Sequence, residues 1–313
     1  MKWGLGESYS RTSIVPERIR AYIDLTKPAS TVGMSVAFLF GSLFFFYYHN
    51  NIHGIISNWA NVVFATVTVA LAHGASQTLN MAEDADMDAK TEHKRNRPIP
   101  SGLVSVDEAR TLAWILILIS LGRAYMVDTQ FGMMMTVTIF FGVFYNLGPI
   151  RAKERRISIP WQAVSRGLLS FPVVWSAYGN VYSALPWTLG LFMFFYVLGF
   201  QNSADIIDRE VDASHNIKTF VVMYGVKGVS VIASGSMFMM IAVMSFGISM
   251  NIVPRDLSSM LLIIPFCLFM LYHMAVNPHK IDSRTGNHPS WMWYYAGVML
   301  SFVIPFLTEY FIR

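Results

Sequence analysis

The sequence predicts an all-α membrane protein, on the basis of its low charge content, its long apolar stretches and the placement of its basic residues. Only 13% of the 313 residues are charged and 54% are hydrophobic, whereas soluble domains carry about 25% charged residues. Too few polar side chains remain to cover a soluble globule of this size. The aromatic residues, 23 Phe, 14 Tyr and 8 Trp, suit helices that face a lipid bilayer and the aromatic belts at its interfaces.

Nine stretches are long and apolar enough to predict membrane-spanning helices, each of which needs about 20 residues. They are roughly Ala29–Tyr48, Trp59–Leu79, Thr111–Val127, Phe131–Leu147, Trp161–Val181, Leu185–Phe200, Val226–Ser249, Leu257–Val276 and Trp291–Ile312. We expect them to form one transmembrane domain over residues 1–313. Ahead of the third stretch, Ser105 and Glu108 form the S-x-x-E pattern of a capping box, which satisfies free N–H groups at a helix start.

Basic residues are concentrated on one side of the predicted bundle. If nine spans alternate in direction, the N-terminal segment and the connections after the second, fourth, sixth and eighth spans share one side, and the opposite loops hold a single basic residue, Arg255. Cytoplasmic loops carry such an excess of Lys and Arg. We therefore expect a multi-pass protein of the cell membrane with a cytoplasmic N-terminus and an external C-terminus. This topology accounts for the net charge of +4 without a nucleic-acid partner.

Polar and acidic residues recur at the cytoplasmic ends of the second and sixth spans. The two groups are Asn80, Asp84 and Asp88, and Asp205, Asp208 and Asp212. Spacings of three or four residues place the side chains of each group on one face of a helix. The last two aspartates of the first group each precede their counterparts in the second group by 124 residues, which suggests a weak internal repeat whose halves bring the groups together. The match fails at Met81, where the second group has Asp205.

Carboxylates on one helix face at a membrane boundary repel each other, because the effective dielectric constant there is low. A cation should lie between them, and Mg²⁺ is the natural candidate because it prefers carboxylate oxygens and keeps positions open for phosphate. Basic residues flank both groups and would bind further phosphate charge; they are Lys94, Arg95, Arg97, Lys153 and Lys218. We infer a diphosphate ligand whose apolar tail extends into the bundle. The alternative, a solvated helix end, is more easily reconciled with one acidic group than with two matched groups.

At these residues the sequence resembles the UbiA superfamily of intramembrane prenyltransferases, and the resemblance covers essentially the whole chain. Asn80–Asp88 matches the family's N-D-x-x-D-x-x-x-D except at Met81, and Asp205–Asp212 matches its D-x-x-D-x-x-x-D. Three further stretches are similar to family features: T-K-P at Thr26–Pro28, R-N-R-P-I-P-S-G at Arg95–Gly102, and Y-N-x-G-P…K at Tyr145–Lys153. The resemblance implies nine transmembrane helices around a central cavity, Mg²⁺ dependence, and transfer of an isoprenoid chain from its diphosphate to a lipophilic acceptor.

The resemblance also implies roles for individual residues. Two Mg²⁺ ions are expected, one held by Asn80, Asp84 and Asp88 and one by Asp208 and Asp212, with Asp205 as a further ligand or a supporting neighbour. The ions neutralise charge on the diphosphate as its C–O bond breaks. Residues expected to act in catalysis are Asp84, Asp88, Asp208, Asp212 and Tyr145, whose ring would stabilise the allylic cation.

Residues expected to bind substrate are Asn80, Arg97, Lys153, Arg166 and Lys218. The three loop cations among them are explained equally well by membrane topology. Arg166 lies inside the fifth span, where a charge is costly and usually faces a cavity or a partner. It would contact the diphosphate or an acidic acceptor, or else extend to the interface. Met81 would occupy a spare ligand position or line the acceptor pocket.

Two other functions share part of this pattern. A membrane terpene cyclase would use the same ionisation, with the cation attacking its own chain, and the motifs fit that outcome equally. A cation or metabolite transporter would place its acidic residues near the bilayer midplane, whereas here they lie at helix ends. The sequence leaves the acceptor open among aromatic acids, quinone precursors, porphyrins, carotenoids and glyceryl lipids, and it leaves the prenyl chain length open as well.

The distribution of basic residues makes a prediction about topology. A reporter fused after Arg313 should read as external, and one inserted in the Lys90–Arg97 connection as cytoplasmic, because the excess of Lys and Arg marks the cytoplasmic side. Reporter activity in intact cells measures both positions. If the two reporters lie on the same side of the membrane, the nine-span count is wrong.

Overall fold

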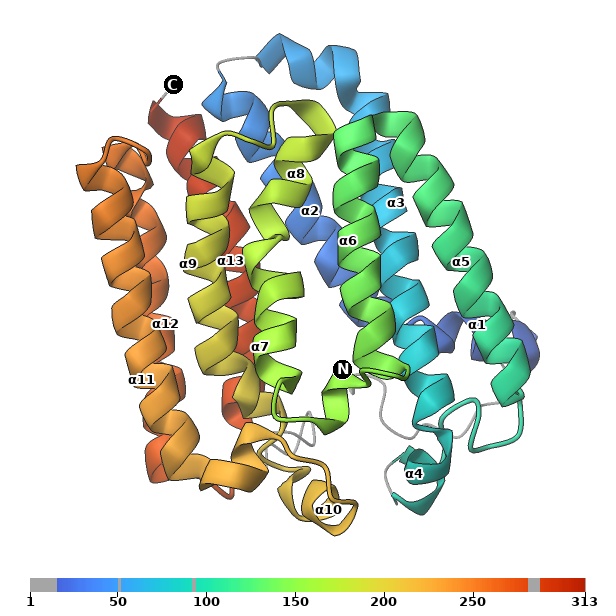
Figure 1. Cartoon of the computed structure of the whole chain (residues 1–313). Coiled ribbons are helices and arrows are strands. Elements are labelled where there is room, and N and C mark those ends of the chain that lie inside the picture. The colour runs from blue at the N-terminus through green and yellow to red at the C-terminus, as the bar shows by residue number, and fades with distance from the viewer. Residues whose placement is uncertain (1–15, 50–51, 92–93, 281–287, 313) are drawn as a thin grey trace.

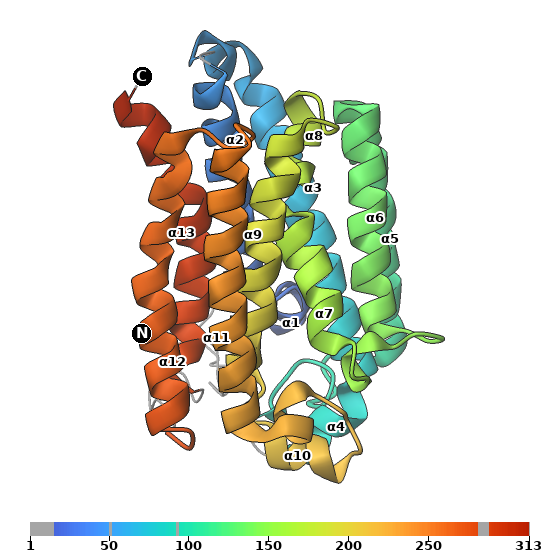
Figure 2. The ribbon, with the colours of Figure 1, turned by 60° about the vertical axis from the view of Figure 1, so that its left-hand side comes forward.

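The computed structural model describes residues 16–49, 52–91, 94–280 and 288–312 (Figures 1 and 2). All regular structure in these ranges is helical, which confirms the predicted fold class. The α-helices are α1 (Glu17–Leu25), α2 (Pro28–Tyr48), α3 (Ile52–Glu83), α4 (Ala85–Lys90), α5 (Val106–Val127), α6 (Thr129–Asn146), α7 (Ser158–Gln162), α8 (Ser170–Tyr178), α9 (Ala184–Phe200), α10 (Arg209–Ser214), α11 (Phe220–Ser249), α12 (Ile264–Val276) and α13 (Pro289–Ile312). Shorter 3₁₀ or π segments are η2 (Ala152–Glu154), η3 (Ala163–Leu168), η4 (Gln201–Ala204) and η5 (Arg255–Ile263).

Within the described ranges, seven helices are long and apolar enough to cross a membrane, so the chain is a multi-pass membrane protein. They are Pro28–Tyr48, His53–Glu83, Val106–Val127, Ala184–Ala204, Phe220–Ser249, Arg255–Val276 and Pro289–Phe311. Each coincides with a predicted span. The predicted spans 131–147 and 161–181 are not among the seven, so the count of nine is not confirmed. The first of these two forms the 18-residue helix α6, which packs against α3 and α5 (Figure 1).

The other predicted span, 161–181, is broken into α7, η3 and α8. Its middle segment, η3, is a π-helix in which the Leu169 N–H donates to the Val164 carbonyl five residues back, at 3.0 Å. Pro172 lacks the N–H that would bond to the Leu168 carbonyl in a regular α-helix. That carbonyl oxygen instead faces Gly190 of α9, where a Cβ atom would lie 2.1 Å away. The proline and the close approach of α9 together explain the break.

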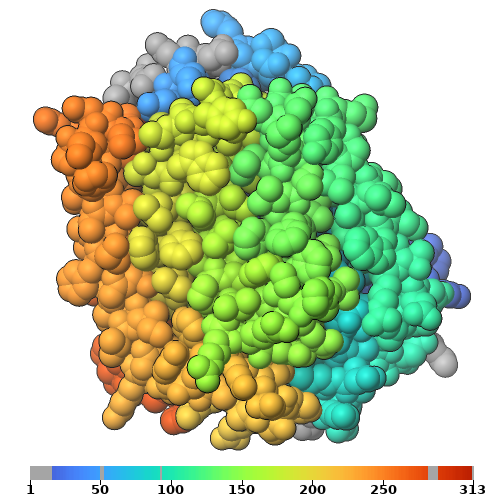
Figure 3. All heavy atoms as spheres, in the orientation of Figure 1, coloured from blue at the N-terminus to red at the C-terminus, as the bar shows by residue number. Residues whose placement is uncertain are grey.

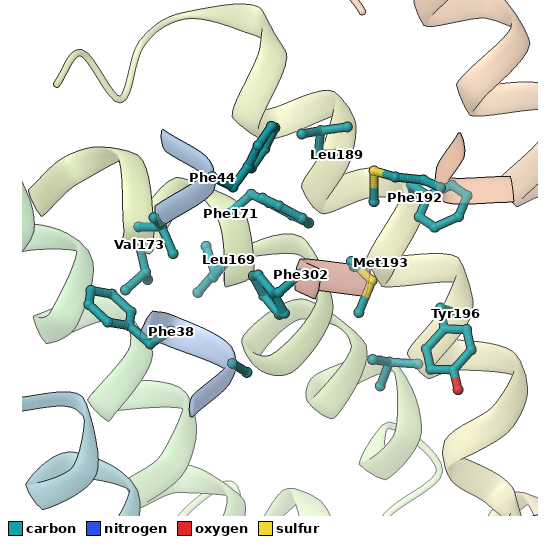
Figure 4. Close-up of a cluster of buried hydrophobic side chains, with 14 of the residues drawn as sticks. Phe38, Phe44, Leu169, Phe171, Val173, Leu189, Phe192, Met193, Tyr196 and Phe302 are labelled. Carbon is teal, nitrogen blue, oxygen red and sulfur yellow. The ribbon is translucent and has the colours of Figure 1, made fainter. Parts of the chain in front are cut away.

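A cluster of large apolar side chains fills the centre of the bundle (Figure 4). Phe44 of α2, Phe171 of α8 and Phe302 of α13 are all buried, and the rings of Phe171 and Phe302 stack with their centroids 4.8 Å apart. On α9, the Tyr196 hydroxyl donates to the Tyr294 carbonyl of α13 at 2.9 Å. Lipid tails are as apolar as this core, so close packing and interhelical hydrogen bonds, rather than escape from water, hold the helices together.

Two short helices, α4 and α10, lie together at one end of the bundle, and α13 ends at the opposite end (Figures 1 and 2). The face formed by α6, α7, α8 and α9 is closely packed, because side chains fill the spaces between the ribbons (Figure 3). A cleft of about 740 Å³ lies between α1 and the segment that leads into α5, lined by residues that include Arg18, Leu103 and Glu108. This cleft is peripheral, so the central cavity stays a prediction.

The contact between η3 and α9 makes a prediction about stability. In Gly190→Ala, the new methyl group would clash with the Leu168 carbonyl oxygen at 2.1 Å, and overpacking of this kind costs about 1–3 kcal/mol. Gly235→Ala in α11 is the matched control, since nothing lies within 4 Å of a Cβ atom there and alanine favours a helix by about 1 kcal/mol. Thermal unfolding in detergent should rank Gly190→Ala well below both Gly235→Ala and the unmodified chain. Equal unfolding temperatures for the two variants would contradict the described packing.

Candidate active site

The two acidic motifs share a local structure that corrects the expectation of one continuous helix face. In both, the chain leaves a long helix and begins a six-residue helix, α4 or α10, at an aspartate: Asp84 is the N-cap of α4 and Asp208 is the N-cap of α10. Aspartate is favoured there because a helix N-terminus has free N–H groups and a positive dipole end. Neither side chain caps its own helix, so both carboxylates remain available to other partners. The 124-residue correspondence therefore reflects a repeated structural feature.

The first motif is held in a chain of polar contacts with three other segments. Asn80, in the last turn of α3, accepts a hydrogen bond from Lys27 Nζ at 3.1 Å and donates to Asp84 Oδ2 at 2.9 Å and Asn146 Oδ1 at 3.0 Å. Asp84 Oδ1 accepts from Lys153 Nζ at 2.5 Å. The motif is thereby linked to the start of α2, the end of α6 and the segment η2.

Ion pairs join the first motif to its own following loop, and that loop to the second motif. Asp88 is 1% exposed and accepts from Arg97 Nη1 at 2.5 Å. Lys94 Nζ lies 3.7 Å from Asp208 Oδ2 of the second motif. The loop that was expected to carry phosphate-binding cations thus spans the two motifs and brings them to one site.

Among the described residues, the carboxylates of the second motif have fewer cationic partners than those of the first: Lys94 pairs with Asp208, whereas Lys153 and Arg97 both pair with the first motif. Burial, together with the carboxylates of Asp212 and Asp208, raises the pKa of Asp205 to about 8. Burial and the Asp208 carboxylate raise the pKa of Asp212 to about 6, against the opposing effect of Lys94. Negative charge on this cluster is therefore costly unless a further cation approaches it.

The three remaining predicted residues take different places. Tyr145 of α6 accepts a hydrogen bond from Gln162 Nε2 at 3.0 Å, and the carboxylates of Asp205 and Asp84 both act on it electrostatically. Arg166 lies in η3, is half-buried, and is close enough to Tyr294 and Tyr295 of α13 to interact with them electrostatically. Lys218 is exposed, and its backbone N–H donates to the Glu154 carbonyl at 3.1 Å. The structure brings the first two into the bundle and leaves the third at its surface.

Met81 takes neither of the places expected for it. It is 7% exposed and packs in a small apolar cluster with Ala21 and Leu25 of α1 and with Ile99. This cluster fixes α1 against the end of α3. Methionine here supports packing, and a carboxylate at position 81 would have to be buried among apolar side chains, which is costly.

Sequence reasoning missed Lys27 and Asn146 as members of the site. Lys27 adopts a left-handed backbone conformation, with φ 46°, immediately before Pro28 at the start of α2. Burial lowers the pKa of Lys27 to about 7, and the positive charge of Arg97 adds to this effect. An anionic ligand beside it would favour its protonated form. Its T-K-P context and the Y-N context of Asn146 were visible in the sequence, but their contact with Asn80 depends on the packing of α2 and α6 against α3.

The residues of the site fit Mg²⁺ that is bound together with phosphate. Among the described residues, no group of three or more His, Cys, Asp or Glu side chains is arranged to hold a metal by itself, because the carboxylates of the first motif face Lys153 and Arg97. Mg²⁺ is usually bound by one or two carboxylates plus substrate phosphates and water, and not by an all-protein cage. The oxygen ligands suit that mode of binding, and the raised pKa values of Asp205 and Asp212 show that a cation is needed there before both carboxyls are charged.

Solved structures share this fold. A UbiA homologue from Archaeoglobus fulgidus bound to GPP and Mg²⁺ superposes with a TM-score of 0.71, at 19% identity over 92% of this chain and 99% of that one. The same homologue bound to DMAPP and Mg²⁺ gives a TM-score of 0.70 at 18% identity. A digeranylgeranylglyceryl phosphate synthase gives a TM-score of 0.64 at 17% identity, over 93% of this chain and 99% of that one. The fold is that of a polytopic helical bundle, and two of these solved structures carry a prenyl diphosphate together with Mg²⁺.

The family itself is shown by sequence. The model of the UbiA prenyltransferase family matches residues 52–297, and the chain belongs to this family. A protoheme IX farnesyltransferase from Caulobacter sp. (strain K31) is 33% identical over 134 residues, which are 42% of this chain and 38% of that protein. A 4-hydroxybenzoate octaprenyltransferase from Polaromonas naphthalenivorans is 27% identical over 176 residues, which are 55% of this chain and 58% of that protein. These matches span less than two thirds of the relatives' lengths.

The second motif makes a prediction about pH. Asp205 and Asp212 have pKa values near 8 and 6 in the folded chain, above the ordinary aspartate value of about 3.9 expected for the unfolded chain. The folded state therefore binds more protons, and in EDTA the free energy of unfolding should fall as the pH rises from 5 to 7. Asp205→Asn should flatten this fall, whereas the control Asp107→Asn, at an exposed position, should not. Unfolding temperatures in EDTA across this range test the prediction, which is wrong if Asp205→Asn and the unmodified chain give parallel profiles.

Proposed function

We propose that this protein is an intramembrane prenyltransferase that moves an isoprenoid chain from its diphosphate to a lipophilic acceptor. The observation that carries the proposal is the meeting of the two acidic motifs at one end of the bundle, where Lys94 from the first motif's loop pairs with Asp208 of the second. The site places carboxylate and amide oxygens beside Lys and Arg side chains. The oxygens suit a divalent ion, and the cations suit a diphosphate. Membership of the UbiA prenyltransferase family supports the same activity.

The cations of the site would exchange carboxylate partners for phosphate oxygens when the donor binds. Lys153, Arg97 and Lys94 each pair with an aspartate of the motifs, and Lys27 contacts Asn80. Once these cations have turned to phosphate, the aspartates are free to bind metal. We propose that two Mg²⁺ ions are then held by Asp84, Asp88, Asp208 and Asp212, with Asn80. Mg²⁺ bound there would supply charge neutralisation on the diphosphate as its bond to carbon breaks. Lys218 is exposed, and we propose it as a contact for phosphate at the mouth of the site.

The proposed reaction breaks the bond between C1 of the prenyl chain and the diphosphate oxygen, and both electrons leave with the diphosphate. A bond then forms between C1 and a nucleophilic atom of the acceptor, which releases a proton. Lys27, Lys153 and Arg97 would stabilise the charge that grows on the leaving group, an electrostatic effect that is strong where water is excluded. Tyr145, fixed by its hydrogen bond from Gln162, would place its ring beside the allylic cation.

A product assay tests the proposed function. Purified protein in lipid nanodiscs would be incubated with Mg²⁺, radiolabelled geranyl, farnesyl or geranylgeranyl diphosphate, and a set of acceptors: protoheme, 4-hydroxybenzoate and a native lipid extract. A product whose mass equals acceptor plus prenyl group minus one hydrogen supports the proposal, as does acceptor plus prenyl group plus one hydroxyl, which results where C1 adds to a vinyl group of protoheme and water captures the cation. Labelled cyclic hydrocarbon formed without an acceptor would identify a cyclase instead, and recovery of unchanged diphosphate in every mixture would contradict both activities.

Single substitutions in the two motifs make the assignment specific. Asp84→Ala and Asp208→Ala should each lower kcat by at least about 100-fold, because contacts to the leaving diphosphate strengthen as negative charge develops on it. Asp86→Ala is the matched control: Asp86 lies in the same stretch but is exposed, and its removal should leave kcat within about twofold. Each variant should remain folded, as judged by its elution in size-exclusion chromatography. Retained activity in the double variant Asp84→Ala/Asp208→Ala would contradict the two-motif site.

A further inference from the structure

Asn146, the last residue of α6, joins the first acidic motif to its own helix without carrying a charge. It is 1% exposed. Its Nδ2 donates to the Gly142 carbonyl at 3.0 Å, and its Oδ1 accepts a hydrogen bond from Asn80 Nδ2 at 3.0 Å. Both ends of this buried amide are therefore occupied, and one of its two partners is a residue that we assign to Mg²⁺.

The packing of α6 against α3 brings the two amides together. A Cβ atom on Gly142 would lie 3.1 Å from Ser76 Oγ of α3, closer than ordinary van der Waals contact. Gly142 precedes Asn146 by four residues, and Ser76 precedes Asn80 by four, which is about one helical turn in each case. The glycine therefore allows the two helices to approach closely, and the hydrogen bond between the amides forms one turn further along both of them.

The chemistry of the partners determines how each amide is turned. A backbone carbonyl can only accept a hydrogen bond, so Asn146 must direct its Nδ2 to Gly142 and its Oδ1 to Asn80. Asn80 must then direct its Nδ2 to Asn146, and the same Nδ2 also donates to Asp84 Oδ2 at 2.9 Å. The Asn80 Oδ1 is left to face Lys27 Nζ, at 3.1 Å. This relay of hydrogen bonds thus ends with an amide oxygen turned towards a cation.

Two of the three partners of Asn80 are groups that the ligands would draw away. Asp84 would turn to Mg²⁺ and Lys27 to phosphate, and either movement removes a contact that orients the Asn80 amide. Asn146 is uncharged and bonds to the backbone of its own helix, so neither ligand attracts it. Without Asn146, the Asn80 amide could rotate and present its N–H groups, which cannot replace the oxygen ligands that Mg²⁺ requires.

We propose that Asn146 is a positioning residue, which holds the Asn80 amide so that its oxygen, and not its N–H groups, is available to Mg²⁺ while the ligands are bound. This inference rests on the proposed function, because that function assigns Asn80 to the metal. Side chains that hold metal ligands by hydrogen bonds typically lower metal affinity about 10- to 100-fold when they are removed. The loss of Asn146 should therefore be seen first in metal binding.

The first experiment measures metal binding without turnover. Mn²⁺ would be titrated into the full chain in nanodiscs together with inorganic diphosphate, and free Mn²⁺ would be measured by electron paramagnetic resonance. Asn146→Leu, which has a similar shape but no hydrogen-bonding atoms, should weaken Mn²⁺ binding at least about 10-fold. Asn146→Asp keeps an oxygen opposite Asn80 and should not weaken it. Ser76→Ala, a control at the neighbouring contact between α3 and α6, should leave Mn²⁺ binding unchanged.

A double-mutant cycle separates positioning from packing. In Asn80→Asp the carboxylate has two equivalent oxygens, so there is no amide to orient, and one of these oxygens would repel the Asn146 oxygen. Asn146→Leu in this background should therefore leave Mn²⁺ binding unchanged or strengthen it. A residue that only packed α6 against α3 would cause the same loss in both backgrounds, because independent effects add. Equal losses in the two backgrounds would overturn the inference.

Comparison with the product assay distinguishes failure of this inference from failure of the proposed function. In that assay, Asn146→Leu should raise the Mg²⁺ concentration for half-maximal rate at least about 10-fold and leave the KM for geranyl diphosphate at saturating Mg²⁺ within about twofold. Unchanged Mn²⁺ binding by Asn146→Leu, where the unmodified chain forms prenylated product, would overturn the inference alone. If the unmodified chain binds no Mn²⁺ with diphosphate present, the inference and the proposed metal site fail together. The expected cycle supports the inference even if no product forms.

Discussion

Carboxylate and amide side chains gather where two long helices leave the membrane, and their charge has to be balanced by cations from other segments. Lys153 pairs with Asp84, Arg97 with Asp88, and Lys94 with Asp208. Such pairs gain strength from the low dielectric constant, and removal of either partner leaves the other charge without compensation. The ion pairs therefore connect the η2 segment, the loop after α4 and the start of α10. The same groups are those that a diphosphate and Mg²⁺ would engage.

The long helices do not continue through the site, and their breaks determine its geometry. At Asp84 and Asp208 the chain turns into α4 and α10, so each motif surrounds a turn instead of following one helix face. At Gly225, φ is 67° within α11, a value that suits glycine because a Cβ atom would be strained there. This kink lies shortly after α10 and lets the chain re-enter the bundle from the second motif. The motifs are thus displayed on short segments that long helices anchor at both ends.

Charge is graded with depth in this bundle. Paired cations and carboxylates occupy the end where α4 and α10 lie (Figures 1 and 2). Arg166 lies one helical segment further into the bundle. The uncharged polar side chains of His73, Ser30 and Gln77, which contact one another, also lie further in. Beyond them lies the cluster of large apolar side chains around Phe171 and Phe302 (Figure 4). A prenyl diphosphate has the same order of polarity, from its charged head to its apolar tail.

The sequence by itself determined the helical class, the position of the seven longest apolar helices, the capping box at Ser105 and the two acidic motifs. Each of these depends on residues that are close in the chain: an apolar run, an S-x-x-E pattern, or aspartates three and four residues apart. The capping box is confirmed, since Ser105 and Glu108 bond to each other's backbone N–H groups.

The tertiary structure decided what lies next to those residues. The sequence could not show that Lys27 reaches Asn80 across 53 positions, that Lys94 reaches Asp208, or that Met81 packs against α1. It also placed a single helix over 161–181, where the chain instead forms α7, η3 and α8. Pro172 contributes to that break because it lacks a backbone N–H, and the contact of Gly190 with the Leu168 carbonyl completes it. Long-range contacts of this kind depend on how helices pack, and apolar periodicity is the same for a straight and a broken helix.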